Sequence, residues 1–204
     1  MPELSNIQTY EKLKGSDFKP TLERFAKVLN RIGLWNDEIK RAFESFEWKI
    51  EDDGYVYSSI TEVGSYPTRF SEIKVRPLVM AWTPAVDETF EENWISCDLL
   101  IESENIRNHS NGNYKDLAFP LIKKLVKEMS IEFHQTGIYF TDEAQDGGDF
   151  DGVRTNDQDE LWSFDYALIP VELTELYREK PNNYGVNKID NWIESWNLDN
   201  WKAK

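Results

Sequence analysis

The spacing of apolar residues predicts two short helices in the first quarter of the chain. Between residues 20 and 33 they recur at three- and four-residue intervals, which is the pattern of one helix face. These positions are Leu22, Phe25, Ala26, Leu29 and Ile32. Pro20 suits a first helical turn and Gly33 a C-terminal cap. Asn36 is a good N-cap for a second helix, so we expect a helical hairpin. Residues 1–19 lack this pattern and are expected to form a polar, partly ordered lead-in.

Strand patterns dominate the middle of the chain. Residues 55–61 are rich in aromatic and β-branched side chains, and 73–82 form another candidate in which Pro77 indicates an edge strand or a bulge. Residues 94–102 alternate most clearly, with one apolar face expected in the core and the other mostly in water. Residues 133–141 are expected to form the last of these strands.

Helical spacing returns at 114–129, where Pro120 must kink the helix or mark its true start. Two further helices are expected near the end of the chain, one from Pro170 and one from Asn187. The last would be rich in tryptophan and either packs into the core, which is the favoured interpretation, or docks on a partner. Of its tryptophans, Trp201 near the terminus is expected to be the most exposed.

The order of these elements predicts an α+β fold. We expect a single domain over residues 20–204, with a largely antiparallel sheet and helices packed on one face. A chain of 204 residues suits one domain, and its composition supplies enough large apolar side chains for a core.

An acidic segment, residues 141–165, stands out from the rest. It holds nine carboxylates and a single base, Arg154, and so accounts for −8 of the chain's net charge of −15. A cationic protein would relieve the repulsion among these charges, and long-range attraction would speed its association. The residues expected to contact such a partner are Asp142, Glu143, Asp146, Asp149, Asp151, Asp157, Asp159, Glu160 and, from the C-terminus, Trp201.

Two other interpretations of the segment remain open. Asp146, Asp149 and Asp151, with flexible glycines between them, offer the hard oxygen ligands of Ca²⁺ or Mg²⁺, although Val153 breaks the EF-hand pattern. Asp157 or Asp159 could complete a metal-dependent hydrolase. The segment could also be a solvated loop without a specific role.

Few other residues indicate catalysis. The sequence therefore favours a protein that is not an enzyme, without deciding the question. The two histidines, His109 and His134, are too few to favour a zinc site, and Cys97 falls on an apolar strand face, as a buried, inert thiol would. Glu62 with Glu72 and Lys74 resembles the residue set of a metal-dependent nuclease, but such a pattern is common. No cofactor is expected beyond a possible divalent cation.

The net charge and the hydropathy of the chain limit the classes of partner that we expect. The negative average field opposes direct binding of nucleic acid or anionic lipid, and no apolar run approaches the length of a membrane span. With no leader pattern and one cysteine, we expect a cytoplasmic protein. The leading hypothesis is a binding protein for a basic protein partner, for example an immunity or inhibitor protein for a nuclease toxin. The alternatives are the hydrolase and a structural subunit that docks through its Trp-rich C-terminal helix.

Overall fold

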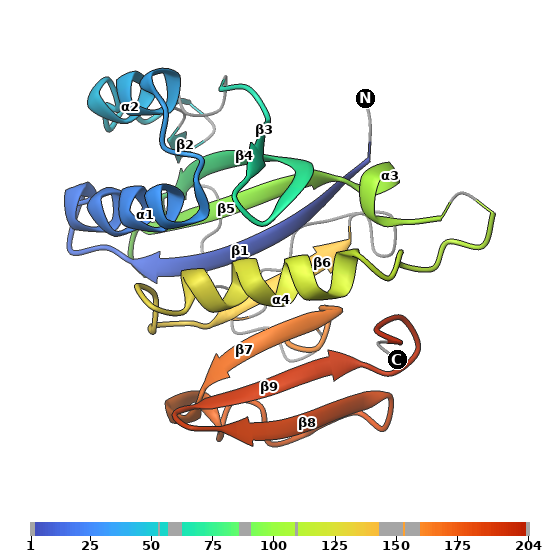
Figure 1. The fold of residues 1–204 in the computed structure, drawn as a ribbon. Coiled ribbons are helices and arrows are strands. Elements are labelled where there is room, and N and C mark those ends of the chain that lie inside the picture. Colours follow the sequence, from blue (N-terminus) through green and yellow to red (C-terminus); the bar gives the residue numbers. More distant parts are fainter. Residues whose placement is uncertain are drawn as a thin grey trace.

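The computed structural model describes residues 3–52, 54–56, 63–85, 91–108, 110–142, 153 and 160–202. Within these ranges the chain forms one mixed α+β domain around an antiparallel sheet (Figure 1), which confirms the predicted fold class. The strands are β1 (Leu4–Lys12), β2 (Tyr55–Val56), β3 (Tyr66–Thr68), β4 (Ser71–Trp82), β5 (Trp94–Glu102), β6 (Ile138–Asp142), β7 (Tyr166–Pro170), β8 (Tyr184–Ile189) and β9 (Trp192–Asn197). The helices are α1 (Lys19–Ile32), α2 (Asp37–Glu44), α3 (Ser103–Ile106), α4 (Ala118–Met129) and the short 3₁₀ helix η2 (Val171–Leu173).

The strand order is β2-β4-β5-β1-β6-β7-β9-β8, and β3 pairs with β4 outside this path. β1 therefore lies in the middle of the sheet, between β5 and β6, and the prediction of a polar lead-in over residues 1–19 is wrong. The reason is that β1 is buried on both faces although many of its side chains are polar, so no apolar period marks it. Buried polar groups need hydrogen-bond partners: Thr9 Oγ1, for example, donates to the Gly137 carbonyl at 2.7 Å, and the Ser5 hydroxyl donates to Asp142 Oδ1 at 3.1 Å.

The helices expected from the first half of the chain are confirmed. Gly33 caps α1 with a φ of 85°, and the Asn36 side chain accepts a hydrogen bond from the Ile39 amide at 3.0 Å to cap α2. In α4, Pro120 lies in the first turn rather than at a kink, because the helix begins only at Ala118. Proline is tolerated there, since first-turn amides have no partner within the helix.

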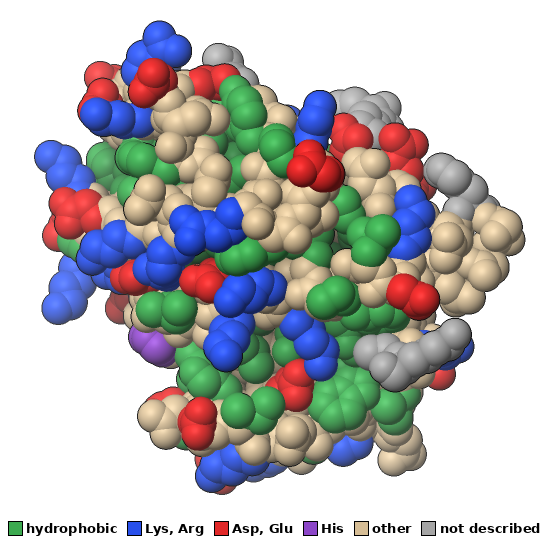
Figure 2. Space-filling view, viewed as in Figure 1, with side chains coloured by type: hydrophobic (Ala, Val, Ile, Leu, Met, Phe, Trp, Pro, Cys, Tyr) green, Lys and Arg blue, Asp and Glu red, His purple; other side chains and the backbone are tan. Residues whose placement is uncertain are grey.

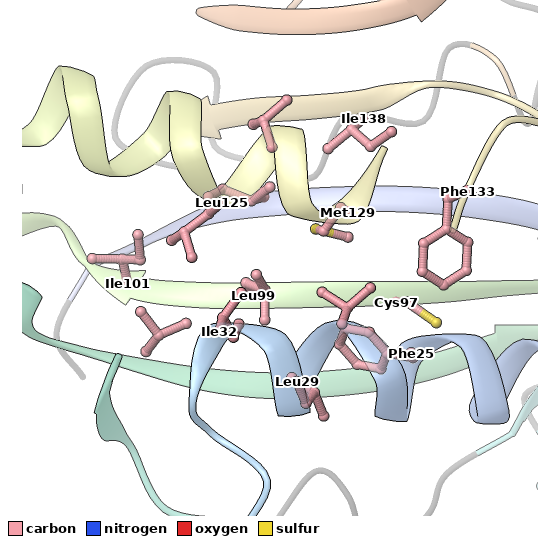
Figure 3. Close-up of a cluster of buried hydrophobic side chains, with 14 of the residues drawn as sticks. Phe25, Leu29, Ile32, Cys97, Leu99, Ile101, Leu125, Met129, Phe133 and Ile138 are labelled. Atoms are coloured by element: carbon pink, nitrogen blue, oxygen red, sulfur yellow. The ribbon is translucent and has the colours of Figure 1, made fainter. Parts of the chain in front are cut away.

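The core has two hydrophobic clusters, which take alternate residues of the same strands. In the first, buried residues of α1 and α4 pack with residues such as Cys97 and Leu99 of β5 (Figure 3). Buried residues of α2 belong to the same cluster. The second includes Trp82, Trp94 and Tyr139, together with residues that follow the acidic segment, such as Phe164. Both faces of β5 are consequently buried, so the expectation that one face is wet is wrong. Cys97 is buried as predicted, and burial raises the pKa of its thiol well above the usual value.

The remaining predicted strands differ mainly in length. β6 begins at Ile138 rather than at residue 133. β2 is described at Tyr55 and Val56, and the rest of the strand predicted over 55–61 lies outside the described residues. In β4, Pro77 pairs with Leu99 of β5, and no described strand pairs with its other side. The edge position or bulge predicted for this proline stays a prediction, because residues 57–62, which follow β2, lie outside the described residues.

The helix predicted from Asn187 is absent, because residues 184–197 form the hairpin β8–β9. The helix predicted from Pro170 is reduced to the short 3₁₀ helix η2. Trp192 and Trp196 are four residues apart, which fits one face of a helix but equally one face of a strand, where every second residue points the same way. Asp190, with a φ of 52°, and Asn191 form the two-residue turn that decides between them.

Trp201 is 4% exposed and not the exposed contact that we expected. Its ring stacks on Tyr166, with centroids 5.0 Å apart, and meets Phe119 edge-on at 4.8 Å. The hypothesis of a structural subunit requires a Trp-rich C-terminal helix with an exposed tryptophan. Residues 184–197 form a hairpin instead, and Trp201 is buried.

Gly137 leads into β6 and has no room for a side chain. Its φ is 101°, and a Cβ placed there would lie 2.9 Å from the Leu168 carbonyl oxygen. We predict that Gly137→Ala lowers the free energy of unfolding in urea by about 2–4 kcal/mol, because backbone strain of about 1–3 kcal/mol adds to this collision. Gly15→Ala is the matched control, since Gly15 also has a positive φ but nothing within 4 Å of its Cβ position. Equal losses in the two variants would contradict the steric argument.

Candidate functional site at the base of the acidic segment

The two ends of the acidic segment lie side by side. Asp142 is the last residue of β6, and Asp165 directly precedes β7. The two strands pair antiparallel, with Phe140 opposite Tyr166. The connection between them, residues 143–164, therefore leaves the sheet and returns to it at the same end of two neighbouring strands.

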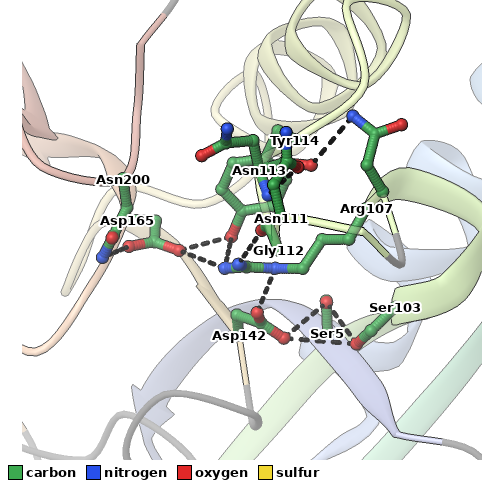
Figure 4. Close-up of polar contacts among 11 residues, drawn as sticks. Ser5, Ser103, Arg107, Asn111, Gly112, Asn113, Tyr114, Asp142, Asp165 and Asn200 are labelled. Carbon is green, nitrogen blue, oxygen red and sulfur yellow. Dashed lines mark hydrogen bonds and ion pairs between the residues drawn. The ribbon is translucent and has the colours of Figure 1, made fainter.

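Arg107 holds these two ends together (Figure 4). It follows α3, and its guanidinium forms an ion pair through Nε with Asp142 Oδ2 and lies 3.6 Å from Asp165 Oδ2 through Nη2. Both aspartate side chains are fully buried, and the arginine side chain is 18% exposed. We call Arg107, Asp142, Asp165 and Tyr114 the carboxylate clasp.

Hydrogen bonds complete the surroundings of Asp165. The Tyr114 hydroxyl donates to Asp165 Oδ2 and accepts from Arg107 Nη2 at 2.9 Å. Asn200 Nδ2 donates to Asp165 Oδ1 at 3.0 Å. The Arg107 guanidinium also lies over the Tyr114 ring, 4.2 Å from its centroid. The clasp thus joins the acidic segment to the loop after α3 and to the C-terminal residues.

Asp142 is held by two serines as well as by Arg107. Ser5 and Ser103 donate to its Oδ1 at 3.1 and 3.2 Å, and their own hydroxyl oxygens are 2.8 Å apart. Ser5 belongs to β1 and Ser103 to α3, so the end of β6 is tied to the centre of the sheet.

Electrostatics in the clasp are unbalanced, because two buried carboxylates share one guanidinium. Burial raises the pKa of Asp165 above its ordinary value, and the hydrogen bonds from Tyr114 and Asn200 only partly oppose this. Burial, followed by the charge of Asp165, raises the pKa of Tyr114 well above its usual range, so the hydroxyl remains a donor at neutral pH. Since both carboxylates are closed to solvent, the geometry suits anchoring better than contact with a substrate.

The sequence-predicted contact residues fall into three groups. Asp142 is buried in the clasp, so the prediction that it contacts a partner is wrong. The physical reason is that Asp142 belongs to the acidic run in the sequence but is the last residue of the buried strand β6. Glu160 is exposed. The other acidic positions of the contact set and of the metal site lie outside the described residues: Glu143, Asp146, Asp149, Asp151, Asp157 and Asp159.

Some of the remaining candidates for chemistry lie within the described residues. His134 is exposed, with its ring centroid 5.4 Å from that of Trp192, and Glu72 and Lys74 are exposed on β4. His109 and Glu62 lie outside the described residues. In the part of the chain that the structure describes, no group of three or more His, Cys, Asp or Glu could hold a metal ion, and no helix could span a membrane.

Sequence reasoning missed Arg107, Tyr114 and Asn200. Arg107 stands in a run of turn-forming residues, and nothing in its neighbourhood indicates its partners 35 and 58 positions further along the chain. One signal was present: Asp165 lies between Phe164 and Tyr166, and Asp142 lies two residues after Phe140. A carboxylate so close to apolar strand residues is often buried and then needs a partner.

Removal of the guanidinium should destabilise the fold strongly. We predict that Arg107→Met lowers the free energy of unfolding by about 3–5 kcal/mol at neutral pH, because two buried carboxylates lose their counter-charge. Arg178→Met is the control, since Arg178 is 71% exposed and its only described ion pair is 3.9 Å long. A loss in Arg107→Met no larger than in the control would show that the clasp contributes nothing to stability.

The raised pKa of Asp165 predicts a pH dependence with a definite sign. A carboxyl group that binds its proton more tightly in the folded state adds stability as pH falls through its folded pKa. From about pH 7 to about pH 4, around the carboxyl range, the stability of the wild type should therefore rise relative to Asp165→Asn. Urea unfolding of both proteins across this range measures the difference, and a difference that changes in the opposite direction would refute a raised pKa.

Comparisons with known proteins do not place this geometry in a family. No protein-family model matches the chain, and neither a curated protein nor a solved structure matches it. The functional argument therefore rests on the residues and contacts of the chain itself.

Proposed function

We propose that this chain is a non-enzymatic binding protein that uses residues 143–160 of its acidic segment against a basic protein partner. The observation that carries the proposal is the carboxylate clasp, because it fixes both ends of the segment at one place on the sheet. Residues 143–160 contain seven carboxylates and one arginine. Both ends of the connection that carries these charges are thus anchored next to each other on the sheet.

A cationic partner fits this charge for two physical reasons. Like charges in one connection repel one another, and an opposite charge relieves the repulsion. The concentrated field also steers a basic protein towards the segment and raises its association rate. Asp142 and Asp165 are not part of the contact surface, since both are buried and paired with Arg107.

The face of the molecule on which α1 and α4 lie (Figure 1) differs in charge from the acidic segment. Figure 2 shows many Lys and Arg side chains on this face, among acidic and apolar ones. Several carry their own acidic partners: Lys123 pairs with Glu194 at 3.0 Å, and Arg31 with Glu132 at 2.6 Å. The excess negative charge of the chain is thus unevenly distributed, which supports a binding role for the acidic segment and not for the helices.

An inhibitor or immunity protein for a basic nuclease is one concrete form of this function. The active face of such a nuclease has Lys and Arg side chains that bind phosphates. Closely spaced carboxylates can form ion pairs with the same side chains. The protein would then block the nuclease without any catalytic step of its own.

Neutralisation of the segment tests the proposal. We predict that Asp146→Asn, Asp149→Asn and Asp151→Asn, made together, weaken capture of a basic protein from the native host at low salt. Glu172→Gln, Glu175→Gln and Glu179→Gln form the control, because these exposed carboxylates change the net charge equally elsewhere on the surface. Capture by the wild type should fall steeply as salt rises.

Three results would overturn the proposal. They are recovery of no basic partner by the wild type, equal capture by both triple variants, and capture that does not change with salt. A partner that binds both variants equally would indicate attraction to overall charge and not to the segment.

A further inference from the structure

Strand β8 ends the sheet and, in the described part of the chain, pairs with β9 alone. The hairpin closes with Ile189 opposite Trp192 across a two-residue turn, so residues 185, 187 and 189 direct their backbone groups towards β9. The hydrogen bond from the Leu198 amide to the Asn183 carbonyl, at 2.7 Å, continues this odd-numbered series. The even-numbered residues therefore direct their N–H and C=O groups outward.

At the Tyr184 end of β8, the outward backbone groups are already hydrogen-bonded within the chain. The Tyr184 amide donates to the Pro181 carbonyl at 3.2 Å, and the Tyr184 carbonyl accepts from Lys180 Nζ at 2.7 Å. The outward backbone groups of Val186 and Lys188 follow, in a stretch where every side chain is exposed. We call residues 186–188 the edge window.

We propose that a second copy of this chain pairs antiparallel with the edge window, with Asn187 on the two-fold axis. In this register Val186 lies opposite Lys188 of the partner subunit, and each pair exchanges two backbone hydrogen bonds. By symmetry the same pair forms twice, so all four outward groups of the window on each copy are satisfied. The window is self-complementary in the way that a two-fold interface requires.

The neighbouring registers fit less well. A shift in one direction places Lys188 directly opposite Lys188 of the partner subunit, and like charges in that position are destabilising. A shift in the other direction opposes Lys188 to Tyr184, whose outward groups are already hydrogen-bonded within the chain. Only the register centred on Asn187 avoids both conflicts.

Side chains on both faces gain contacts in the proposed register. Val186 is 46% exposed and would be covered by the methylene stem of the opposing lysine. Ile189 is 42% exposed and would lie opposite Gly185. The Trp196 ring covers Gly185 so closely that a Cβ there would be 2.4 Å from Trp196 Cε2. Ile189 would thus meet an aromatic surface.

Charge favours a second copy over the basic partner at this edge. In residues 180–194, Lys180 and Lys188 balance Asp190 and Glu194, so the hairpin is locally neutral in a chain of net charge −15. Lysine on an edge strand usually prevents strand pairing. Here the register places it opposite valine, where it does not oppose a like charge.

A cysteine at the two-fold axis tests the register in the full-length protein. Residues opposed in a pair without backbone hydrogen bonds have Cα atoms about 4.5 Å apart, within the disulfide range of about 4.4–6.8 Å. Asn187→Cys should therefore form a covalent dimer under mild oxidation, more completely than Val186→Cys or Lys188→Cys. Cys97 does not interfere, because it is 1% exposed. Equal cross-linking at all three positions, or none at position 187, would overturn the proposal.

Proline in the edge window provides the second test. Val186→Pro removes only an outward N–H and is compatible with an edge strand, whereas Val186→Thr keeps the N–H and a β-branched side chain. In sedimentation velocity over a dilution series, the wild type and Val186→Thr should move from monomer towards dimer as concentration rises, and Val186→Pro should remain monomeric. A wild type that is monomeric throughout, or a Val186→Pro protein that dimerises like the wild type, would refute the pairing.

Discussion

The structure depends on the burial of a polar strand. β1 lies between β5 and β6 with both faces covered, and each of its residues from Ser5 to Tyr10 is at most 7% exposed. Buried hydroxyl and amide groups cost free energy unless they are hydrogen-bonded, so this strand requires partners at fixed positions. Thr9 bonds to the Gly137 carbonyl, and Ser5 bonds to Asp142. The central strand therefore specifies the positions of β6 and of the residues around it.

The same requirement leads to the carboxylate clasp. Asp142 is buried at the end of β6, where it needs a counter-charge, and Arg107 from the loop after α3 supplies it. Because the guanidinium also approaches Asp165, one arginine fixes both ends of the most acidic connection in the chain. The proposed binding function and the stability of the sheet are thus linked through one side chain. A change at Arg107 would be expected to affect both.

The two proposals concern regions of different chemistry. The acidic segment carries an excess of negative charge, which is the basis for proposing a basic protein partner. The hairpin β8–β9 is locally neutral, and the backbone groups of Val186 and Lys188 point away from β9. Because the two regions differ in sequence and in chemistry, binding at one does not require binding at the other. Two copies joined through β8 would carry two acidic segments, which is an arrangement that can strengthen attachment to a partner with repeated sites.

The sequence by itself determined the α+β class, the capped helices α1 and α2, and strand β5, because these features are recorded in local apolar spacing and in capping residues such as Asn36 and Gly33. It also determined the uneven charge, which needs no coordinates. Only the tertiary structure decided that residues 4–12 form the central strand, that the tryptophans near the C-terminus belong to a hairpin and a core, and that Arg107 joins Asp142 and Asp165. The physical reason is that spacing records which face of an element is apolar. It does not record which distant residue will satisfy a buried polar group, and a spacing of four fits a helix and a strand equally well.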